Sequence, residues 1–540
     1  MADEWDYIVV GAGSAGCVLA NRLTESGQHK VLVLEAGPWD SSPLITMPAG
    51  FYKLLSSKTY NWGFATEPEE GTGQRSIAIP RGKTLGGSSA INGSIYVRGQ
   101  PLDFNLWSQF GNRGWSYESV LPYFKKAERY ASGSGPVRGP VRGYNGPLVV
   151  TETTERHELL DACIAAGVDQ GYPHNPDYNS GDQEGFGYYQ LTQRDGRRMS
   201  TARSYLRKAM YRGNLKIITR AQITRVLIEN GRAVGVEYRR GGTLHQARCQ
   251  MEVLLSAGAV QSPQLLELSG IGQPRLLKEH GIDVTQELPG VGENYRDHYG
   301  VRMQWRVKQP ITLNEKARGL SLLRELARYA FHGRGILTYG AGAVYGFIRS
   351  TADQETPDIQ YHIAHVSYAD PATRKLDRLP GMTMACCQLR PDSQGSIHIK
   401  SADPFAAPAI RGNYLDVQSD ADTLVRGIKL GRQVVESSAL EPYRAAEFTP
   451  GPLRQSDAEI EDWARHTGQT LYHICGTAKM GPSTDRMAVV DDELRVHGVA
   501  GLRVIDASIM PTLVSGNTNA AAIMIAERGA DLVLGRTEQP

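Results

Sequence analysis

Cysteine is scarce in this sequence, and features of several common protein classes are missing. Only six of the 540 residues are cysteine and none form a CxxC pair, which argues against a disulfide framework and a zinc site. No apolar run approaches the roughly 20 residues needed to span a bilayer. The acidic first residues also lack the basic and apolar segments of a secretory signal. We therefore predict a cytoplasmic protein with no transmembrane segment and no metal site, which leaves peripheral membrane association open.

Long runs of one charge are also absent. The 59 basic and 57 acidic residues give a net charge of +2 and are spread along the chain. This distribution gives no reason to expect nucleic acid as a partner. A length of 540 residues with 41% hydrophobic residues exceeds one average domain, so two domains are expected.

The N-terminal part of the chain has the pattern of a strand, a glycine-rich turn, a helix and a second strand. The apolar residues 7–10 and 31–34 predict the strands, and the stretch that follows Gly16, runs through Leu23 and stops near Gly27 predicts the helix between them. This βαβ pattern is typical of a doubly wound α/β sheet, in which most strands are parallel.

Three glycines in this turn have the spacing of a dinucleotide-binding motif. Gly11 permits the tight turn, Gly13 lets a pyrophosphate approach the backbone, and Gly16 allows the helix and strand to pack closely. Glu35, which lies 19 residues after Gly16 and ends the second strand, can accept hydrogen bonds from both hydroxyls of an adenosine ribose. An acidic residue there disfavours NADP but leaves NAD and FAD open. The alternative is a glycine turn in an unrelated α/β protein.

Later segments predict further strands and a return to the opening pattern. Residues 132–146, rich in Gly, Pro, Ser and Arg, predict a surface loop that separates two lobes. The adjacent Cys386 and Cys387 are expected to be small apolar filling of a strand. Strands are expected at residues 215–218, 253–255, 359–363, 383–389 and 502–505, a hairpin at 225–238 turning at Asn230-Gly231, and a helix at 519–534.

Two longer segments carry a resemblance to a known family. Residues 82–92 read GKTLGGSSAIN and continue to Tyr96 and Gly99, and residues 258–263 read GAVQSP and continue to SGIG at 269–272. Over nearly the whole chain the sequence resembles the glucose-methanol-choline (GMC) family of FAD-dependent alcohol oxidoreductases, nearest its bacterial alcohol and choline dehydrogenase branch. Some members attach the flavin covalently through a histidine in the first segment. Here that stretch reads Ser89-Ala90-Ile91-Asn92, so noncovalent FAD is expected.

The resemblance also implies a catalytic pair. His473, in residues 471–481 (LYHICGTAKMG), matches the family's histidine, and Asn517, in the sequence Gly516-Asn517-Thr518-Asn519, matches a position held by histidine or asparagine. An imidazole can take the hydroxyl proton as hydride leaves the alcohol carbon, and an amide can hold the same oxygen. The alternatives are a buried histidine at a lobe interface and, for Asn517, a helix cap, a role compatible with catalysis.

The remaining site residues are also implied by the resemblance or by the glycine motif. The positive N-terminal end of the 519–534 helix is expected near N1 and O2 of the flavin. Tyr472 and Trp62 are expected to line the substrate cavity. His362 and His365, three apart on a strand, point to opposite faces and should not share a metal ion. The predicted cofactor-binding residues are Gly11, Gly13, Ser14, Ala15, Gly16, Glu35, Ala36, Gly82, Leu85, Gly86, Gly87, Ser88, Asn92, Gly93, Ile95, Ile223, Gly258, Asp506, Ala507, Asn517 and Thr518.

The predicted fold is α/β (α+β overall), with a doubly wound Rossmann-like FAD-binding domain and a discontinuous substrate-binding domain on a mainly antiparallel sheet. Residues 1–150, 206–300 and 461–540 are assigned to the first domain, and residues 151–205 and 301–460 to the second. The predicted reaction oxidises a small primary alcohol to the aldehyde by hydride transfer to flavin N5, with a quinone-like acceptor or dioxygen. The alternatives are an FAD-containing hydroxynitrile-lyase-like enzyme without net redox chemistry and a noncatalytic nucleotide-binding protein.

Overall fold

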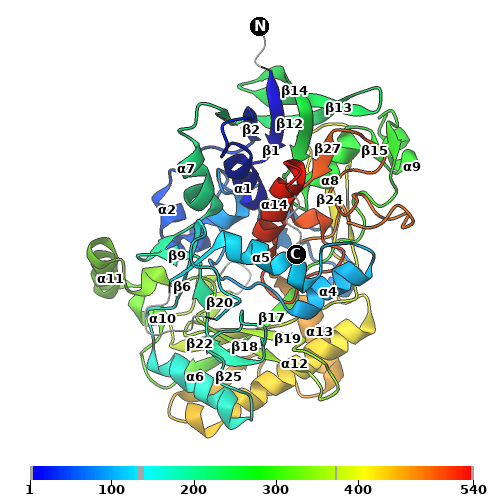
Figure 1. The fold of residues 1–540 in the computed structure, drawn as a ribbon. Coiled ribbons are helices and arrows are strands. Elements are labelled where there is room, and N and C mark those ends of the chain that lie inside the picture. Colours follow the sequence, from blue (N-terminus) through cyan, green and yellow to red (C-terminus); the bar gives the residue numbers. More distant parts are fainter. Residues whose placement is uncertain (1–3, 132–138, 371–373, 537–540) are drawn as a thin grey trace.

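The computed structural model describes residues 4–131, 139–370 and 374–536 and contains two large sheets, one above the other in Figure 1. Each sheet has seven strands. Each also has its own apolar core, built from separate sets of buried side chains. The mixed α/β fold confirms the predicted class.

The first sheet contains the parallel strands predicted from the opening of the chain. The βαβ unit is formed by β1 (Trp5–Val10), α1 (Ser14–Leu23) and β2 (Val31–Glu35). All four pairings among its parallel strands run in the order β11 (Leu215–Thr219), β2, β1, β14 (Thr243–Leu255) and β27 (Leu502–Val504). Segments from the beginning, middle and end of the chain therefore share one sheet.

An antiparallel extension continues this sheet. The first half of β14 pairs with β13 (Arg232–Arg240), which pairs with β12 (Gln222–Glu229). Asn230 and Gly231 connect β12 to β13 with φ angles of 50° and 74°. Positive φ at both positions is what a two-residue hairpin turn requires, so the predicted hairpin is confirmed.

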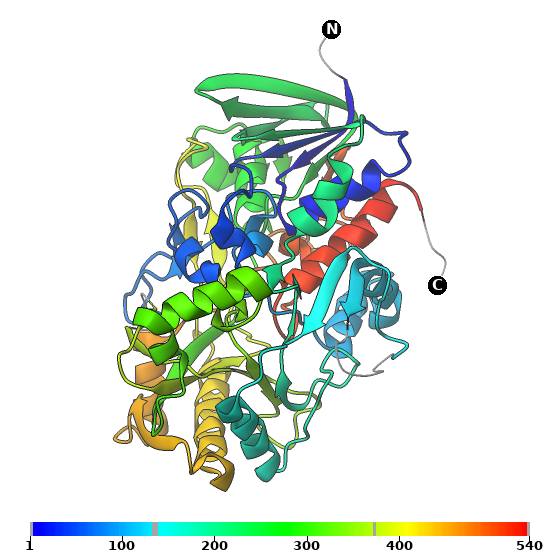
Figure 2. The ribbon, with the colours of Figure 1, turned by 90° about the vertical axis from the view of Figure 1, so that its left-hand side faces the viewer.

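The C-terminal helix packs against the N-terminal helix beside this sheet, as both views show (Figures 1 and 2). The predicted helix is α14 (Asn519–Val533), and it also contacts α5 (Tyr117–Ala127). A salt bridge of 2.7 Å joins Arg22 of α1 to Glu527 of α14, whose carboxylate is buried. The two ends of the chain therefore build one layer over the sheet.

Each pair of neighbouring strands in the second sheet is antiparallel among the described residues, as predicted. α12 (Gln418–Glu436) and α6 (Glu158–Asp169) pack against it. Cys386 and Cys387 lie buried in its centre as free thiols, and the small residue Gly427 of α12 faces Cys386, which fits their expected role as apolar filling. The strands are β25 (Arg444–Thr449), β17 (Tyr299–Val307), β22 (Gly381–Gln388), β19 (Ile359–Ala364), β18 (Val344–Ile348), β7 (Gly185–Tyr188) and β26 (Gln469–Thr470).

The segment predicted to be a surface loop between lobes has a different role. Its residues 132–138 lie outside the described part of the chain, but the strands on either side of it, β5 (Glu128–Ala131) and β6 (Leu148–Glu152), pair with each other in parallel. Arg142 is buried and forms ion pairs with Glu128 at 2.5 Å and Asp177 at 2.9 Å. The expectation of a purely surface segment is wrong at Arg142, because a buried cation needs carboxylate partners and here has two of them.

One helix projects from the body of the molecule (Figure 1). α11 (Gly319–His332) has no buried residue, and its Leu320 and Phe331 are 84% and 82% exposed. Among the described residues no helix is long and apolar enough to cross a membrane. α11 is an amphipathic helix whose apolar face contacts little else in the chain.

Candidate active site

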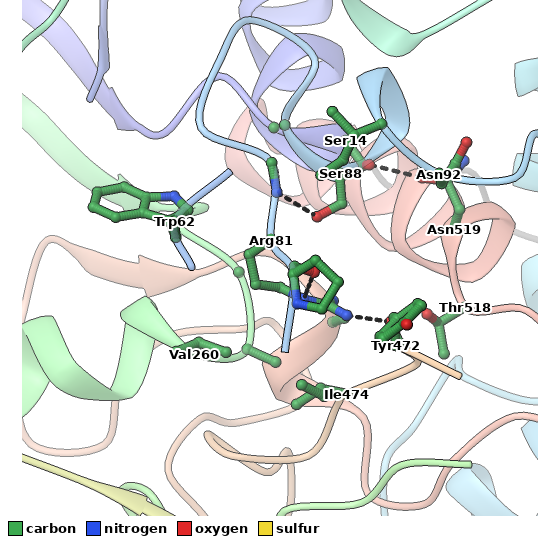
Figure 3. A pocket seen from close by; sticks show the side chains of 18 of the residues that line it. Ser14, Trp62, Arg81, Ser88, Asn92, Val260, Tyr472, Ile474, Thr518 and Asn519 are labelled. Carbon is green, nitrogen blue, oxygen red and sulfur yellow. Dashed lines mark hydrogen bonds between the residues drawn. The ribbon is translucent and has the colours of Figure 1, made fainter. Parts of the chain in front are cut away.

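A long cavity lies between the two sheets, and Figure 3 shows part of its lining. The β1–α1 turn and the end of β2 line it from the first sheet. Strands β17, β19 and β22 contribute Arg302, His362, Thr383 and Ala385 from the second sheet. The predicted pair His473 and Asn517 also lines this cavity. The fold therefore brings the predicted cofactor motif and the predicted catalytic pair to one space.

The three motif glycines have different surroundings. Gly11 has a φ of 93°, and a Cβ there would lie 2.7 Å from the carbonyl oxygen of Ser256. A Cβ at Gly16 would lie 1.8 Å from the carbonyl oxygen of Gly11, so this glycine allows α1 to pack on the turn. Gly11 and Gly13 line the cavity together with Ser14 and Ala15, whereas Gly16 lies behind them.

Glu35 holds the glycine turn from the end of β2. Its Oε2 accepts a hydrogen bond from the amide of Ala12 at 2.9 Å, and its Oε1 accepts one from the amide of Gly37 at 2.7 Å. Burial raises the pKa of this carboxyl group to about 7, although the two amides act in the opposite direction. Glu35 and Ala36 both line the cavity, and each carboxylate oxygen retains a lone pair for a ribose hydroxyl.

The segment containing residues 82–92 lies against this turn. A Cβ at Gly87 would lie 2.7 Å from the Cα of Gly13, and Gly87 has a φ of 50°. Asn92 accepts a hydrogen bond from the buried Arg198 at 2.7 Å. Of the predicted residues in this region, Leu85 and Gly86 lie outside the lining, whereas those that line the cavity are Gly82, Gly87, Ser88, Asn92, Gly93 and Ile95.

The last part of the predicted cofactor set comes from four separate segments. Asp506 accepts hydrogen bonds from the amide of Gly258 at 2.8 Å and the hydroxyl of Ser262 at 2.6 Å. Ser14 of α1 donates a hydrogen bond to Asn519 of α14 at 2.7 Å (Figure 3). The other predicted residues that line the cavity here are Ile223, Gly258, Ala507, Asn517 and Thr518.

His473 is held between a second histidine and Asn517. His298 donates from Nε2 to the carbonyl oxygen of Leu389 at 2.9 Å, so the Nδ1 of the neutral His298 ring is an acceptor. The Nδ1 of His473 lies 2.8 Å from that atom and must therefore donate to it. The Nε2 of His473 is left with its lone pair, and Asn517 donates to it from Nδ2 at 2.8 Å.

Both histidines are neutral in this environment. Burial lowers the pKa of His298 to about 4. Burial also lowers the pKa of His473 well below its usual range, and His298, His362 and Arg81 lower it further. A neutral imidazole whose Nε2 carries a lone pair and no proton can accept a proton, so the arrangement suits a general base.

Asp297 fixes the backbone that carries His473. Its Oδ1 accepts a hydrogen bond from the amide of His473 at 2.8 Å, and its Oδ2 accepts the hydroxyl groups of Tyr414 and Thr470. Tyr472, just before the histidine, has a φ of 69°, an uncommon conformation for a residue other than glycine. These hydrogen bonds hold the chain to Asp297 on both sides of Tyr472 and so stabilise its uncommon backbone conformation.

Asn517 does not cap the helix that follows it. Thr518 is the N-cap residue of α14 and makes no capping hydrogen bond with its side chain. The amide nitrogen of Asn517 bonds to His473 instead, and its Oδ1 is buried without a hydrogen-bond partner among the described residues. The capping alternative is therefore not observed.

The two predicted substrate-cavity residues both line the cavity. Trp62 stacks on Phe64 with ring centroids 5.7 Å apart. Tyr472 accepts a hydrogen bond at its carbonyl oxygen from Arg81 (Figure 3), and its hydroxyl accepts one from Arg374 at 2.8 Å. Both aromatic side chains thus have additional partners that the sequence did not indicate.

His362 and His365 make separate contacts. His362 lines the cavity and hydrogen-bonds the hydroxyl of Tyr189 at 2.8 Å. His365 is buried and stacks on His157 with ring centroids 4.4 Å apart. The part of the chain that the structure describes contains no group of three or more His, Cys, Asp or Glu that could hold a metal ion.

Sequence reasoning missed Asp297 and His298, and it missed the arginines Arg81, Arg302 and Arg374. A signal existed for the first two, since a polar run at residues 294–298 leads directly into a strand-like segment. The arginines gave no local signal, because their convergence depends on three segments that are far apart in the chain.

Comparison with known proteins identifies the family. Two family models described as GMC oxidoreductase match residues 5–300 and 391–526. The chain belongs to the GMC oxidoreductase family. It is 42% identical to oxygen-dependent choline dehydrogenases of Brucella ovis and of Photobacterium profundum, over 99% of this chain and 96% and 94% of those proteins.

This GMC oxidoreductase also has the same fold as solved structures of other proteins. Pyridoxine 4-oxidase from Mesorbium loti has 30% identity and a TM-score of 0.87, covering 98% of each chain. Formate oxidase from Aspergillus oryzae has 26% identity and a TM-score of 0.91, covering 99% of this chain and 98% of the other. The predicted resemblance is confirmed, and the chain is an FAD-dependent oxidoreductase acting on a CH–OH group.

The residues of the cavity fit FAD. Gly258 has a φ of 85°, and a Cβ there would meet no atom within 4 Å, so open space lies over this backbone. The glycines of the β1–α1 turn and Gly87 present bare backbone to the same cavity, where Glu35 lies ready for a ribose. These features match a dinucleotide that extends from the β1–α1 turn toward His473.

Proposed function

We propose that this GMC oxidoreductase oxidises a small primary alcohol to the aldehyde, with His473 as general base and Asn517 as the group that positions the alcohol oxygen. The observation that carries the proposal is the unprotonated Nε2 of His473, which lines the cavity and accepts a hydrogen bond from the amide of Asn517, a place that the alcohol hydroxyl group takes when it binds. FAD, when bound, supplies the acceptor for the hydride that leaves the alcohol carbon.

The roles of the two side chains follow from their chemistry. The Nε2 of His473 takes the hydroxyl proton, while its Nδ1–H stays bonded to His298. The amide of Asn517 donates to the same alcohol oxygen and carries no charge at any physiological pH. The alcohol oxygen is thus held by two groups, which orients the carbon to which it is attached.

Noncovalent binding of FAD is part of the proposal. The segment at residues 82–92 contains no histidine, and Ser89 and Ala90 are buried away from the lining. Acid precipitation of the holoenzyme is expected to release all of the yellow colour into the supernatant. Colour retained in the pellet would contradict this part of the proposal.

The electron acceptor is proposed to be dioxygen or a quinone-like molecule, and one experiment separates them. The holoenzyme is mixed anaerobically with a panel of primary alcohols, and flavin absorbance is followed before and after air is admitted. Bleaching by an alcohol is the expected result, with fast recovery in air indicating dioxygen and slow recovery indicating a quinone-like acceptor. A flavin-loaded protein that no alcohol bleaches would overturn the proposal and favour chemistry without net redox change.

A further inference from the structure

The lining of the cavity near His473 contains positively charged side chains but no described carboxylate. Arg81, Arg302 and Arg374 line the cavity. Among the described residues the only carboxylates in the lining are Glu35 and Asp506. Both already accept hydrogen bonds from backbone amides in the predicted cofactor site, Glu35 from Ala12 and Gly37 and Asp506 from Gly258. Asp297, the nearest carboxylate behind the lining, acts on Arg81, so Arg302 and Arg374 face the cavity with no carboxylate among its described lining residues.

Arg302 lines this part of the cavity from the second sheet. The strand register places Arg302 of β17 beside Ala385 of β22, and Ala385 beside His362 of β19, so all three lie in one row. One guanidinium nitrogen of Arg302 donates to Gln469 at 2.9 Å. An arginine has five N–H donors, so most of its donors remain without a partner among the described residues.

The surroundings of Arg302 disfavour the positively charged form of its side chain. It forms no ion pair with any described residue. Burial lowers the pKa of Arg302, and the positive charge of Arg374 lowers it further. A buried cation without an anionic partner is costly, which indicates that the partner arrives with the ligand.

Arg374 is held beside Arg302 by aromatic side chains. Its guanidinium carbon lies 5.6 Å, 5.8 Å and 5.5 Å from the ring centroids of Phe51, Tyr52 and Tyr472. Within the described residues it donates a hydrogen bond to the hydroxyl of Tyr472 at 2.8 Å. Tyr472 precedes the proposed base, so Arg374 is tied to the same segment that places His473.

We infer that the alcohol substrate carries a carboxylate, which Arg302 and Arg374 bind while its hydroxyl group lies between His473 and Asn517. This inference rests on the proposed function and names the class of its substrate. A guanidinium and a carboxylate form paired, charge-assisted hydrogen bonds, and two arginines can share the two oxygens of one carboxylate. The pyrophosphate of FAD would not supply this anion, since the glycine turn that fits it belongs to the first sheet and Arg302 to the second.

The same residues disfavour a cationic alcohol. Relatives with 42% identity are named choline dehydrogenases, but a quaternary ammonium group is attracted by carboxylates or by aromatic faces free of other cations. Here Arg374 already occupies the aromatic faces of Phe51, Tyr52 and Tyr472. A second cation at this place would be repelled by both arginines.

Two measurements on the holoenzyme test the inference separately from the proposed function. Anaerobic flavin reduction is compared for ω-hydroxycarboxylates, n-alcohols of the same chain lengths, and choline. Binding of unreactive alkanoates is measured by titration calorimetry. The expected result is that a hydroxycarboxylate reduces the flavin at a half-saturating concentration about 10- to 100-fold lower than its neutral counterpart, with choline the poorest.

The variant Arg302→Met is expected to weaken alkanoate binding and raise the half-saturating concentration of the hydroxycarboxylate, each at least about 10-fold, and by a larger factor than for the neutral alcohol. Arg302→Lys should give an intermediate result, because it keeps the charge without the paired donors. Arg324→Gln, on the exposed α11, is the matched control.

Each outcome separates the two claims. If neutral alcohols or choline reduce the flavin better than every hydroxycarboxylate, or if no alkanoate binds, the inferred substrate class is wrong while the alcohol oxidation stands. If alkanoates bind through Arg302 but no alcohol bleaches the flavin, the arginine site stands and the proposed reaction is wrong.

Discussion

The Nδ1 atoms of His298 and His473 lie 2.8 Å apart, and this single contact determines which nitrogen of His473 is free to accept a proton. His298 can accept only because its own Nε2 is committed to the carbonyl oxygen of Leu389. The tautomer of the proposed base is thus set by a backbone carbonyl through an intervening imidazole.

Replacement of His298 tests this relationship. In His298→Ala, Nδ1 of His473 loses its acceptor, and the rate of anaerobic flavin reduction should fall by about 10- to 100-fold, as for other ring-orienting partners. His298→Asn should recover part of the rate, because its amide oxygen can accept from His473 Nδ1. His332→Ala on the exposed α11 is the control for loss of a histidine. Equal rates in His298→Ala and the unmodified enzyme would exclude the orienting role.

Replacement of the proposed catalytic pair separates proton transfer from positioning. His473→Ala should remain yellow with bound FAD but reduce its flavin about 100- to 10,000-fold more slowly, since a general base contributes this much. Asn517→Ala should lower the rate by a smaller factor and also raise the half-saturating alcohol concentration. Stopped-flow flavin reduction measures both quantities. Normal reduction in His473→Ala would contradict the assignment of the base.

The pH dependence of stability follows from the same buried histidines. Burial holds the pKa of His298 at about 4, whereas the unfolded chain has an ordinary histidine near 6.5. Between these values the unfolded state binds more protons, so the free energy of unfolding falls as pH decreases, by about 1.4 kcal/mol per pH unit for this group. The loss begins below about pH 6.5 and levels off below about pH 4.

Comparison of two proteins isolates this contribution from other titrating groups. The thermal midpoint of the holoenzyme should fall between pH 6.5 and pH 4.5, and it should fall less in His298→Asn, which has no group that titrates there. In the same range the rate of flavin reduction should change little, because the pKa of His473 is also lowered well below its usual range by burial. Identical pH dependence of the midpoint in both proteins would contradict the buried neutral state of His298.

Replacement of Gly87 tests the close contact between the 82–92 segment and the β1–α1 turn, where FAD is expected to bind. In Gly87→Ala the new Cβ would lie 2.7 Å from the Cα of Gly13, and the φ of 50° is unfavourable for alanine. We expect the loop to shift from the β1–α1 turn and the FAD content per purified chain to fall several-fold. Gly213→Ala is the control, because a Cβ there meets no atom within 4 Å and its φ is not positive. Full FAD content in Gly87→Ala would show that the close approach is dispensable.

Local patterns in the sequence predicted much of the fold. The apolar strands β1 and β2, the hairpin at Asn230-Gly231 and the helix α14 depend on neighbours in the chain, and the structure contains them all. β6 (Leu148–Glu152) spans the domain boundary placed at residue 150, and the boundaries themselves remain predictions. The burial of Arg142 could not be read locally, because Asp177 lies 35 residues away in the sequence.

The candidate site likewise contains some residues that local sequence patterns predicted and others that they did not. The cofactor glycines, Glu35 and the His473–Asn517 pair lie in recognisable motifs, and the structure places most of them around one cavity. His298, Arg302 and Arg374 belong to no such motif. Their roles arise from strand register and from segments that meet only in the folded chain, as when Ala385 separates Arg302 from His362.

The order of synthesis sets when this cavity can exist. β27 pairs with β14, and α14 bonds to Arg22 and Ser14 of α1, so residues 502–533 complete a sheet and a helical layer begun by residues 5–23. A nascent chain has β1, β2 and β14 with an edge of the sheet and the face of α1 still uncovered. FAD is therefore expected to bind only after residues 502–533 have been synthesised, and a chain that stops before residue 500 would leave apolar β-structure open to aggregation.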